Sequence, residues 1–200
     1  MTIKNLSVIF LSLLAVACNK KSEQPKGSGN SGNASAPINR VEKQQPTFVA
    51  SDSFKVGLGN VYNGYLKVES ALAKDDFILA KEEFQSMHGI LHMLQSDGLD
   101  TLGKVYWDSL DGAFMQVLHP MATSENIAIM RNHLIDFTPL VVKAIEKFGA
   151  TTSEKAYLFH CPMARNNKGA DWIQSDTTKL NPYFGKTMLN CGDFKREISL

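Results

Sequence analysis

The chain of 200 residues carries 21 basic and 20 acidic residues, a formal charge of +1, and 44% apolar residues. This length fits one domain of ordinary size plus an anchor or linker, and the apolar fraction is sufficient for a core. The near-zero charge argues against a nucleic-acid-binding protein and against a polybasic membrane-surface module, because both need an excess of Lys and Arg.

The first 18 residues have the pattern of a targeting segment. Lys4 precedes a short apolar run, Val8 to Leu14, which is too short to span a bilayer comfortably. Ala17 followed by Cys18 resembles a bacterial lipobox, which implies that residues 1–17 are a signal peptide and that Cys18 carries the lipid. An ordinary secretory signal and a retained anchor are the alternatives, and all three place the domain outside the cytoplasm.

Residues 18–47 are rich in Lys, Ser, Gly, Asn, Gln and Pro and predict a flexible tether. A tether of this length has an r.m.s. span of roughly 30 Å, so the domain stays close to the membrane. Asn19 is the residue after the predicted lipidated cysteine, a position at which Asp would indicate a membrane other than the outer one. Because Asn19 is not Asp, the outer membrane is the default location in a double-membraned bacterium. Residues 48–200 are then expected to form a single domain.

Apolar residues recur at helical spacing four times between residues 52 and 149. With short connections, these stripes predict a mainly α fold, an antiparallel four-helix bundle followed by a small irregular or β C-terminal segment. The four stripes begin at Phe54, Phe77, Leu99 and Ile127 and end at Leu72, Leu94, Val117 and Phe148.

Polar residues and prolines predict where these helices begin and end. Asp75 and Asp76 can cap the second helix, and Thr123 or Ser124 can cap the fourth. Pro120 is expected to end the third helix, and Pro139 to kink or divide the fourth, because proline lacks the N–H that an α-helix needs.

The segment 150–200 follows the predicted helices and holds two cysteines, two methionines and a histidine. Tyr157–His160 and Asp193–Ile198 predict strands, with turns between them, in a small hairpin or three-stranded sheet. Such a sheet would bring together the sulfur atoms around Cys161 and those around Cys191.

Lipidation of Cys18 leaves Cys161 and Cys191 as a pair, and two interpretations of that pair stay open. Thiolates and thioethers select soft ions such as Cu(I) and Ag(I). In an exported protein, the same pair can form a disulfide. The proposed metal ligands are Cys161, Met163, Met188 and Cys191, with His160 next.

Four blocks of sequence support a resemblance to a known family. They are Cys161-Pro-Met-Ala164, Gly169-Ala-Asp-Trp172, Asn181-Pro-Tyr-Phe-Gly185 and Met188-Leu-x-Cys-Gly192. Together they resemble the C-terminal signature of a bacterial family of unknown function, found as lipoproteins or exported proteins and fused to periplasmic adaptors of copper and silver efflux pumps. The resemblance covers about residues 157–195 and extends more loosely to Tyr65–Leu72. It implies a role beside heavy-metal efflux, with an efflux adaptor as a partner.

Enzymatic motifs are missing from the sequence. There is no Gly-x-Ser-x-Gly, His-Glu-x-x-His, phosphate loop or Cys-x-x-Cys. His88 and His92 are four residues apart on a predicted helix. They are interpreted either as two polar side chains on a half-exposed face or as a secondary metal contact. The leading hypothesis is therefore a non-enzymatic, lipid-anchored binder of Cu(I) or Ag(I). The alternative is a disulfide-stapled interaction module of a cell-envelope complex.

Overall fold

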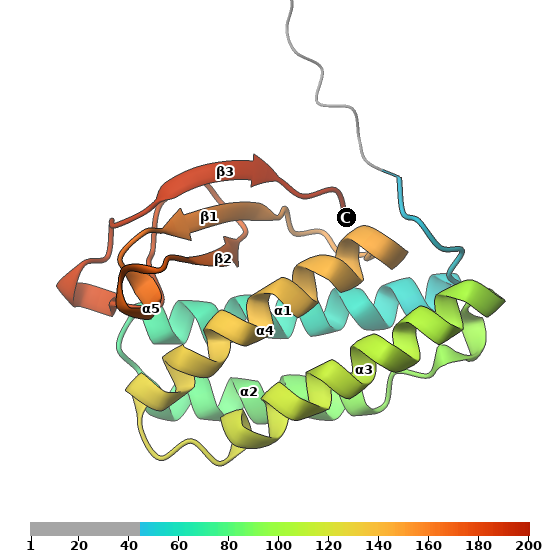
Figure 1. The fold of residues 1–200 in the computed structure, drawn as a ribbon, viewed down its shortest axis with the longest axis horizontal. Coiled ribbons are helices and arrows are strands. Elements are labelled where there is room, and N and C mark those ends of the chain that lie inside the picture. Colours follow the sequence, from blue (N-terminus) through green and yellow to red (C-terminus); the bar gives the residue numbers. More distant parts are fainter. Residues whose placement is uncertain (1–44) are drawn as a thin grey trace, which may run out of the picture. The chain divides into compact units, whose positions relative to one another are not determined.

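The computed structural model describes residues 45–200 (Figure 1). The predicted signal peptide, the predicted lipidation site at Cys18 and most of the predicted tether lie outside the described residues. The helices are α1 (Asp52–Ala73), α2 (Phe77–His92), η1 (Ser96–Gly98), α3 (Thr101–Ala122), α4 (Ile127–Phe148), α5 (Ala164–Asn167) and η2 (Gly185–Thr187). The strands are β1 (Tyr157–Cys161), β2 (Ala170–Gln174) and β3 (Asp193–Glu197).

The four long helices begin at polar caps. The side-chain oxygens of Ser51, Asp76 and Asp100 accept hydrogen bonds from the third amide after them, which satisfies one free N–H at each helix start. Asn126 performs this task for α4, with its Oδ1 3.0 Å from the Ile129 nitrogen. Of the two predicted caps of the second helix, Asp76 is confirmed, whereas the Asp75 side chain binds Arg131 instead. The prediction of Thr123 or Ser124 as the cap of the fourth helix is wrong.

Neither proline interrupts its helix. Pro120 lies inside α3, which continues to Ala122, and Pro139 lies inside α4, which runs unbroken to Phe148. Phe137 and Val141, on either side of Pro139, are both fully buried. The prediction that Pro139 divides the helix is wrong, because tertiary packing of the flanking turns compensates for the hydrogen bond that proline removes.

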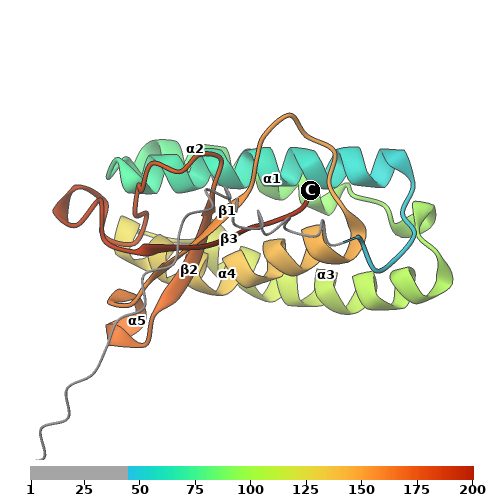
Figure 2. The same ribbon diagram turned by 90° about the horizontal axis from the view of Figure 1, so that it is seen from above.

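The helices form the predicted four-helix bundle, and the sheet covers one side of it. α1 contacts α2, α3 contacts α4, and β2 contacts both α1 and α4. In Figure 2 the strands accordingly lie over the seam between α1 and α4. Among the described residues, none of the helices is both long enough and apolar enough to cross a membrane.

A buried hydrogen-bond relay joins the sheet to both helices below it. The Ile173 N–H of β2 donates to the Tyr65 hydroxyl at 3.1 Å. Tyr65 donates in turn to Thr138 Oγ1 at 2.9 Å, because the Thr138 hydroxyl is already donating to the Leu134 carbonyl. Tyr65 and Thr138 are fully buried, and a buried hydroxyl without a hydrogen bond would destabilise the folded state. Each hydrogen bond of the relay avoids this loss of stability.

The sheet has the strand order β2-β1-β3, and both pairs are antiparallel. Phe159 is paired with Trp172, and the two rings stack at 5.2 Å between centroids. β1 is the central strand, and it ends at Cys161. The predicted small sheet beside the bundle is therefore confirmed, and its central strand carries one of the two cysteines of interest.

Glu69 is the exception to the otherwise satisfied interior. Its side chain is 3% exposed, and its Oε1 has no hydrogen-bond partner among the described residues. Burial raises the pKa of this carboxyl well above its ordinary value; the negative charge of Asp176 adds to the effect and Lys74 opposes it. A raised pKa means that the folded state favours the protonated carboxyl.

Glu69→Gln is expected to change how stability depends on pH. Below the unfolded pKa of about 4.3 the wild-type carboxyl is protonated in both states, so the two proteins should have similar stability. As pH rises through the raised folded pKa, only the wild type loses stability, and by pH 8 the variant should be more stable by about 1–3 kcal/mol. Urea unfolding at pH 4 and pH 8 measures this difference.

Glu82→Gln is the matched control, because Glu82 is exposed on α2 and its replacement should change stability by less than about 0.5 kcal/mol at either pH. A stability difference between Glu69→Gln and wild type that is the same at both pH values would contradict the account of Glu69.

Candidate functional site

The sheet brings Cys161 and Cys191 together. Cys161 is the last residue of β1, and Cys191 lies two residues before β3, the strand that pairs with β1. Their Sγ atoms are 3.7 Å apart. Both are free cysteines, and we call them the thiol pair. Cys161 is fully buried, whereas Cys191 is partly exposed.

The separation of the two sulfur atoms is that of two thiols in ordinary contact, and it is compatible with both interpretations of the pair. A rotation of the side chains would bring the sulfur atoms to the disulfide bond length of about 2 Å. Two sulfurs bound at about 2.3 Å to one tetrahedral metal ion lie about 3.8 Å apart, so a shared ion would also need little movement.

Asn181 fixes the position of Cys191. Its side chain is fully buried; Nδ2 donates to the Cys191 carbonyl at 2.7 Å, and Oδ1 accepts from the Tyr183 N–H at 2.8 Å. The Cys191 N–H donates to the Met188 carbonyl at 3.0 Å. The block that begins at Asn181 therefore holds the backbone of the block that contains Cys191.

Gly192 allows the chain to pass close to the sheet beside Cys191. Its φ is 131°, and a Cβ at this position would lie 2.5 Å from the Trp172 ring. Any other residue would push the ring or the backbone away, and with it the neighbouring thiol.

The surroundings raise the pKa of the Cys191 thiol. Burial is the largest cause, followed by the hydrogen bond and charge of Cys161 and then by the charge of Asp193, with Lys179 acting in the opposite direction. The raised pKa favours the protonated thiol of Cys191, unlike the electropositive sites that make a cysteine a reactive nucleophile.

His160 lies apart from the thiol pair. Successive residues of a strand point to opposite faces, so the imidazole of His160 points away from the Cys161 thiol. Its Nδ1 donates to Asp171 Oδ1 at 2.6 Å, and Asp171 Oδ2 accepts from Lys195 Nζ at 2.8 Å. The imidazole lines a different cavity of about 240 Å³, together with Arg165 and Lys195.

The two methionines occupy different positions relative to the thiol pair. Met188 belongs to the turn that Cys191 closes, so it lies beside the pair in the chain and in the backbone hydrogen bonding. Met163 is 44% exposed and lines a cavity of about 620 Å³ with Asp136 and Tyr183. All five predicted ligands lie in the described part of the chain, and the two cysteines are the pair whose sulfur atoms are in direct contact.

The histidines of the bundle form no second centre. His88 stacks on the Phe84 ring at 6.0 Å between centroids, and His92 is exposed. Within residues 45–200, no group of three or more His, Cys, Asp or Glu side chains is arranged to hold a metal ion.

Sequence reasoning missed Arg131, which fastens the Asn181–Gly185 block to the bundle. Arg131 Nη2 donates to the Leu72 carbonyl and to Asp75 Oδ1, each at 2.6 Å, and Nε donates to the Pro182 carbonyl at 2.7 Å. We call this set of hydrogen bonds the Arg131 network. No short motif reveals it, because its partners lie more than 50 residues from Arg131 in the chain.

Asp75 and Gly185 complete the Arg131 network. The bond from Arg131 is the main reason that the pKa of Asp75 is lowered, and the Lys186 N–H, which Asp75 Oδ2 accepts at 3.1 Å, adds to it. Gly185 has a φ of 55°, and a Cβ there would lie 2.0 Å from Asp75 Oδ1. Glycine is thus required where the block meets the carboxylate.

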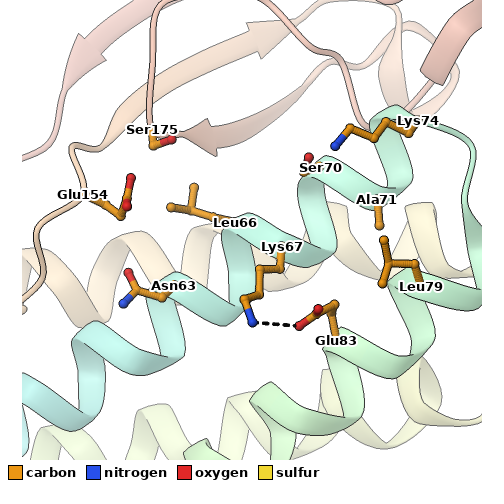
Figure 3. Close-up of a pocket in the computed structure, with 10 residues that line it drawn as sticks. All are labelled: Asn63, Leu66, Lys67, Ser70, Ala71, Lys74, Leu79, Glu83, Glu154 and Ser175. Carbon is orange, nitrogen blue, oxygen red and sulfur yellow. Dashed lines mark ion pairs between the residues drawn. The ribbon is translucent and has the colours of Figure 1, made fainter.

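A further cavity of about 480 Å³ lies between α1, α2 and the loops beside the sheet (Figure 3). In it, Lys67 points toward Glu83 and forms an ion pair at 3.3 Å, while Asn63 and Glu154 line another part of the wall. None of its lining residues belongs to the four sequence blocks. It therefore has no part in the arrangement around the thiol pair.

Arg131→Lys is expected to destabilise the protein by about 2 kcal/mol, because lysine cannot reproduce the forked geometry and leaves buried carbonyls without donors. Urea unfolding measures the loss. Arg165→Lys is the matched control: Arg165 pairs with Asp136, both are about half exposed, and the change should be below about 0.5 kcal/mol. Equal effects of the two substitutions would show that the Arg131 network is not important for the fold.

Comparison with known proteins bears on the helical part of the chain. No curated protein and no solved structure matches the sequence. The resemblance of the four C-terminal blocks to an exported family, and its fusion to efflux adaptors, remain predictions. Residues 61–153, which run from α1 to the segment before β1, match the model of the family described as "Protein of unknown function (DUF3347)".

Proposed function

We propose that the protein is a non-enzymatic binder of a soft metal ion, Cu(I) or Ag(I), in metal homeostasis or efflux. The thiol pair supplies the ligands. The observation that carries the proposal is the 3.7 Å separation of two free thiols in a protein with no catalytic motif. Thiolates favour soft ions, and Cu(I) needs few ligands from the protein.

Met188 is the best candidate for a third ligand. Its carbonyl accepts a hydrogen bond from the Cys191 N–H, so its backbone lies beside that of one of the two cysteines. His160 is a weaker candidate than its place in the sequence indicates, because its Nδ1 is bound to Asp171 and its ring lies on the other face of β1. Zinc fits less well, since structural zinc sites take four Cys or His ligands.

The cellular setting is part of the same proposal. Residues 1–17 act as a lipoprotein signal peptide, and lipid at Cys18 holds the domain on the periplasmic side of the envelope, with the outer membrane as the default. The tether confines the thiol pair near the membrane. A heavy-metal efflux adaptor is the expected partner, and nucleic acid is not, because the mature chain has 20 basic and 20 acidic residues.

A disulfide between Cys161 and Cys191 is the second candidate state, with the protein acting as an interaction module of an envelope complex. The full burial of Cys161 favours it, since a buried staple needs no access for a ligand. Closing this loop, whose ends are 30 residues apart, would stabilise the fold by roughly 3–4 kcal/mol on the chain-entropy model.

Titration of the reduced, mature lipoprotein in detergent with Cu(I), against a chromogenic Cu(I) chelator, tests the proposal. We expect one equivalent to bind, and Cys161→Ser to weaken binding at least about 100-fold, because one thiolate is lost. His92→Gln is the control, since it removes an exposed imidazole away from the thiol pair and should leave the affinity unchanged.

Failure of the reduced wild type to compete for Cu(I) would rule out the metal-binding function. A count of zero free thiols in protein taken directly from cells would favour the disulfide-stapled module instead.

A further inference from the structure

A soft ion needs a route to the thiol pair. Cys161 is fully buried, and the nearby Phe159 and Trp172 rings are buried as well. Moving a bare cation through apolar surroundings is costly, so its transfer requires ligands along the way. This inference rests on the proposed function, and it concerns how the ion reaches the site.

The cavity beside Met163 is lined by residues that adjoin the strands near the thiol pair. It has a volume of about 620 Å³ and lies between α4 and the turn that follows β1. Its wall includes Ala164, three residues after Cys161, and Tyr183. The Tyr183 hydroxyl donates to the Asp171 carbonyl of β2, and the Tyr183 ring lies edge-on to Trp172 at 6.3 Å between centroids. The wall of the cavity is therefore packed against β2, the strand that pairs with β1 as far as Cys161.

Met163 presents a soft ligand to this cavity. Its side chain is 44% exposed, while its carbonyl is held by the Asn167 N–H at 3.2 Å. The backbone of the turn is unusual, because Arg165, Asn166 and Asn167 have φ of 54°, 55° and 63°. A left-handed turn of three non-glycine residues is costly and persists where the surrounding structure dictates it. The turn fixes Met163 while leaving its thioether accessible.

The electrostatics of the cavity permit a cation. Arg165 would repel it, but Arg165 is paired with Asp136 on α4. The other polar lining side chains are uncharged: the amides of Asn132, Asn166 and Asn167 and the phenol of Tyr183. An uncharged thioether binds Cu(I) without releasing a proton, and it holds the ion less firmly than thiolates do.

We propose that Met163 is a capture ligand, which takes Cu(I) or Ag(I) from the cavity and passes it to the thiol pair. In the transfer, the bond from the ion to the Met163 sulfur breaks as bonds to Cys161 and Cys191 form. The thiols release their protons to water, and the ion keeps its oxidation state. Met163 therefore determines how fast the site fills, and the cysteines determine how tightly the ion is held.

Stopped-flow transfer of Cu(I) from its bicinchoninate complex to the reduced lipoprotein tests the proposal. Met163→Leu should lower the transfer rate constant about tenfold and leave the equilibrium affinity within about twofold of wild type. Met93→Leu is the matched control: Met93 is 76% exposed at the end of α2, away from the cavity, and neither quantity should change. Circular dichroism confirms that the variants are folded.

Each other outcome contradicts the proposal in a different way. An unchanged rate for Met163→Leu would mean that the ion enters past the partly exposed Cys191. A tenfold loss of affinity would make Met163 a permanent ligand. No Cu(I) uptake by the wild type would overturn both the proposed function and this inference, whereas normal uptake with an unchanged Met163→Leu rate would overturn the inference alone.

Discussion

The Arg131 network is the interaction on which the candidate site depends. Arg131 is on α4, yet it donates to the C-terminal end of α1 and to Pro182 in the segment between β2 and β3. That segment has little regular structure of its own. From Pro182 the path to the site is short: the neighbouring Asn181 holds the Cys191 carbonyl, and Cys191 then lies opposite Cys161. A guanidinium in the bundle therefore sets the spacing of two thiols beside the sheet.

The bundle and the sheet were predictable because their signals are local. Apolar spacing located the four helices, and short β patterns placed Cys161 and Cys191 next to two strands of one small sheet. The errors came where tertiary structure overrides a local rule. Pro139 remains inside α4 because the flanking turns are buried.

The site was predictable only in part. The cysteine pair follows from strand pairing, but two predicted ligands diverge from it for geometric reasons. His160 and Cys161 are neighbours in a strand and so point to opposite faces. Met163 follows β1 and precedes a turn in which Arg165, Asn166 and Asn167 have positive φ. The Asn-Asn-Lys-Gly pattern predicts a turn there, but it does not show where Met163 lies relative to the cysteines. The Arg131 network joins residues distant in the chain, and one sequence does not reveal such contacts.

The scaffold and the sulfur chemistry lie in different parts of the chain. The family match covers residues 61–153, which build most of the bundle, and it ends before the thiol pair. The bundle supplies Arg131, Tyr65 and Thr138, the groups that hold the sheet and its loops in place. The C-terminal segment supplies every sulfur ligand of the proposed site. A rigid support with a small, adjustable sulfur site is consistent with binding an ion and giving it up.

The central claim is that one soft ion is held by the sulfur atoms of Cys161 and Cys191. X-ray absorption spectroscopy of the reduced lipoprotein loaded with one equivalent of Cu(I) tests it most directly. The account predicts a cuprous edge and a first shell of two or three sulfur atoms, with no nitrogen. A first shell dominated by nitrogen or oxygen would contradict it, because the ion would then lie at His160 or at another site away from the thiol pair.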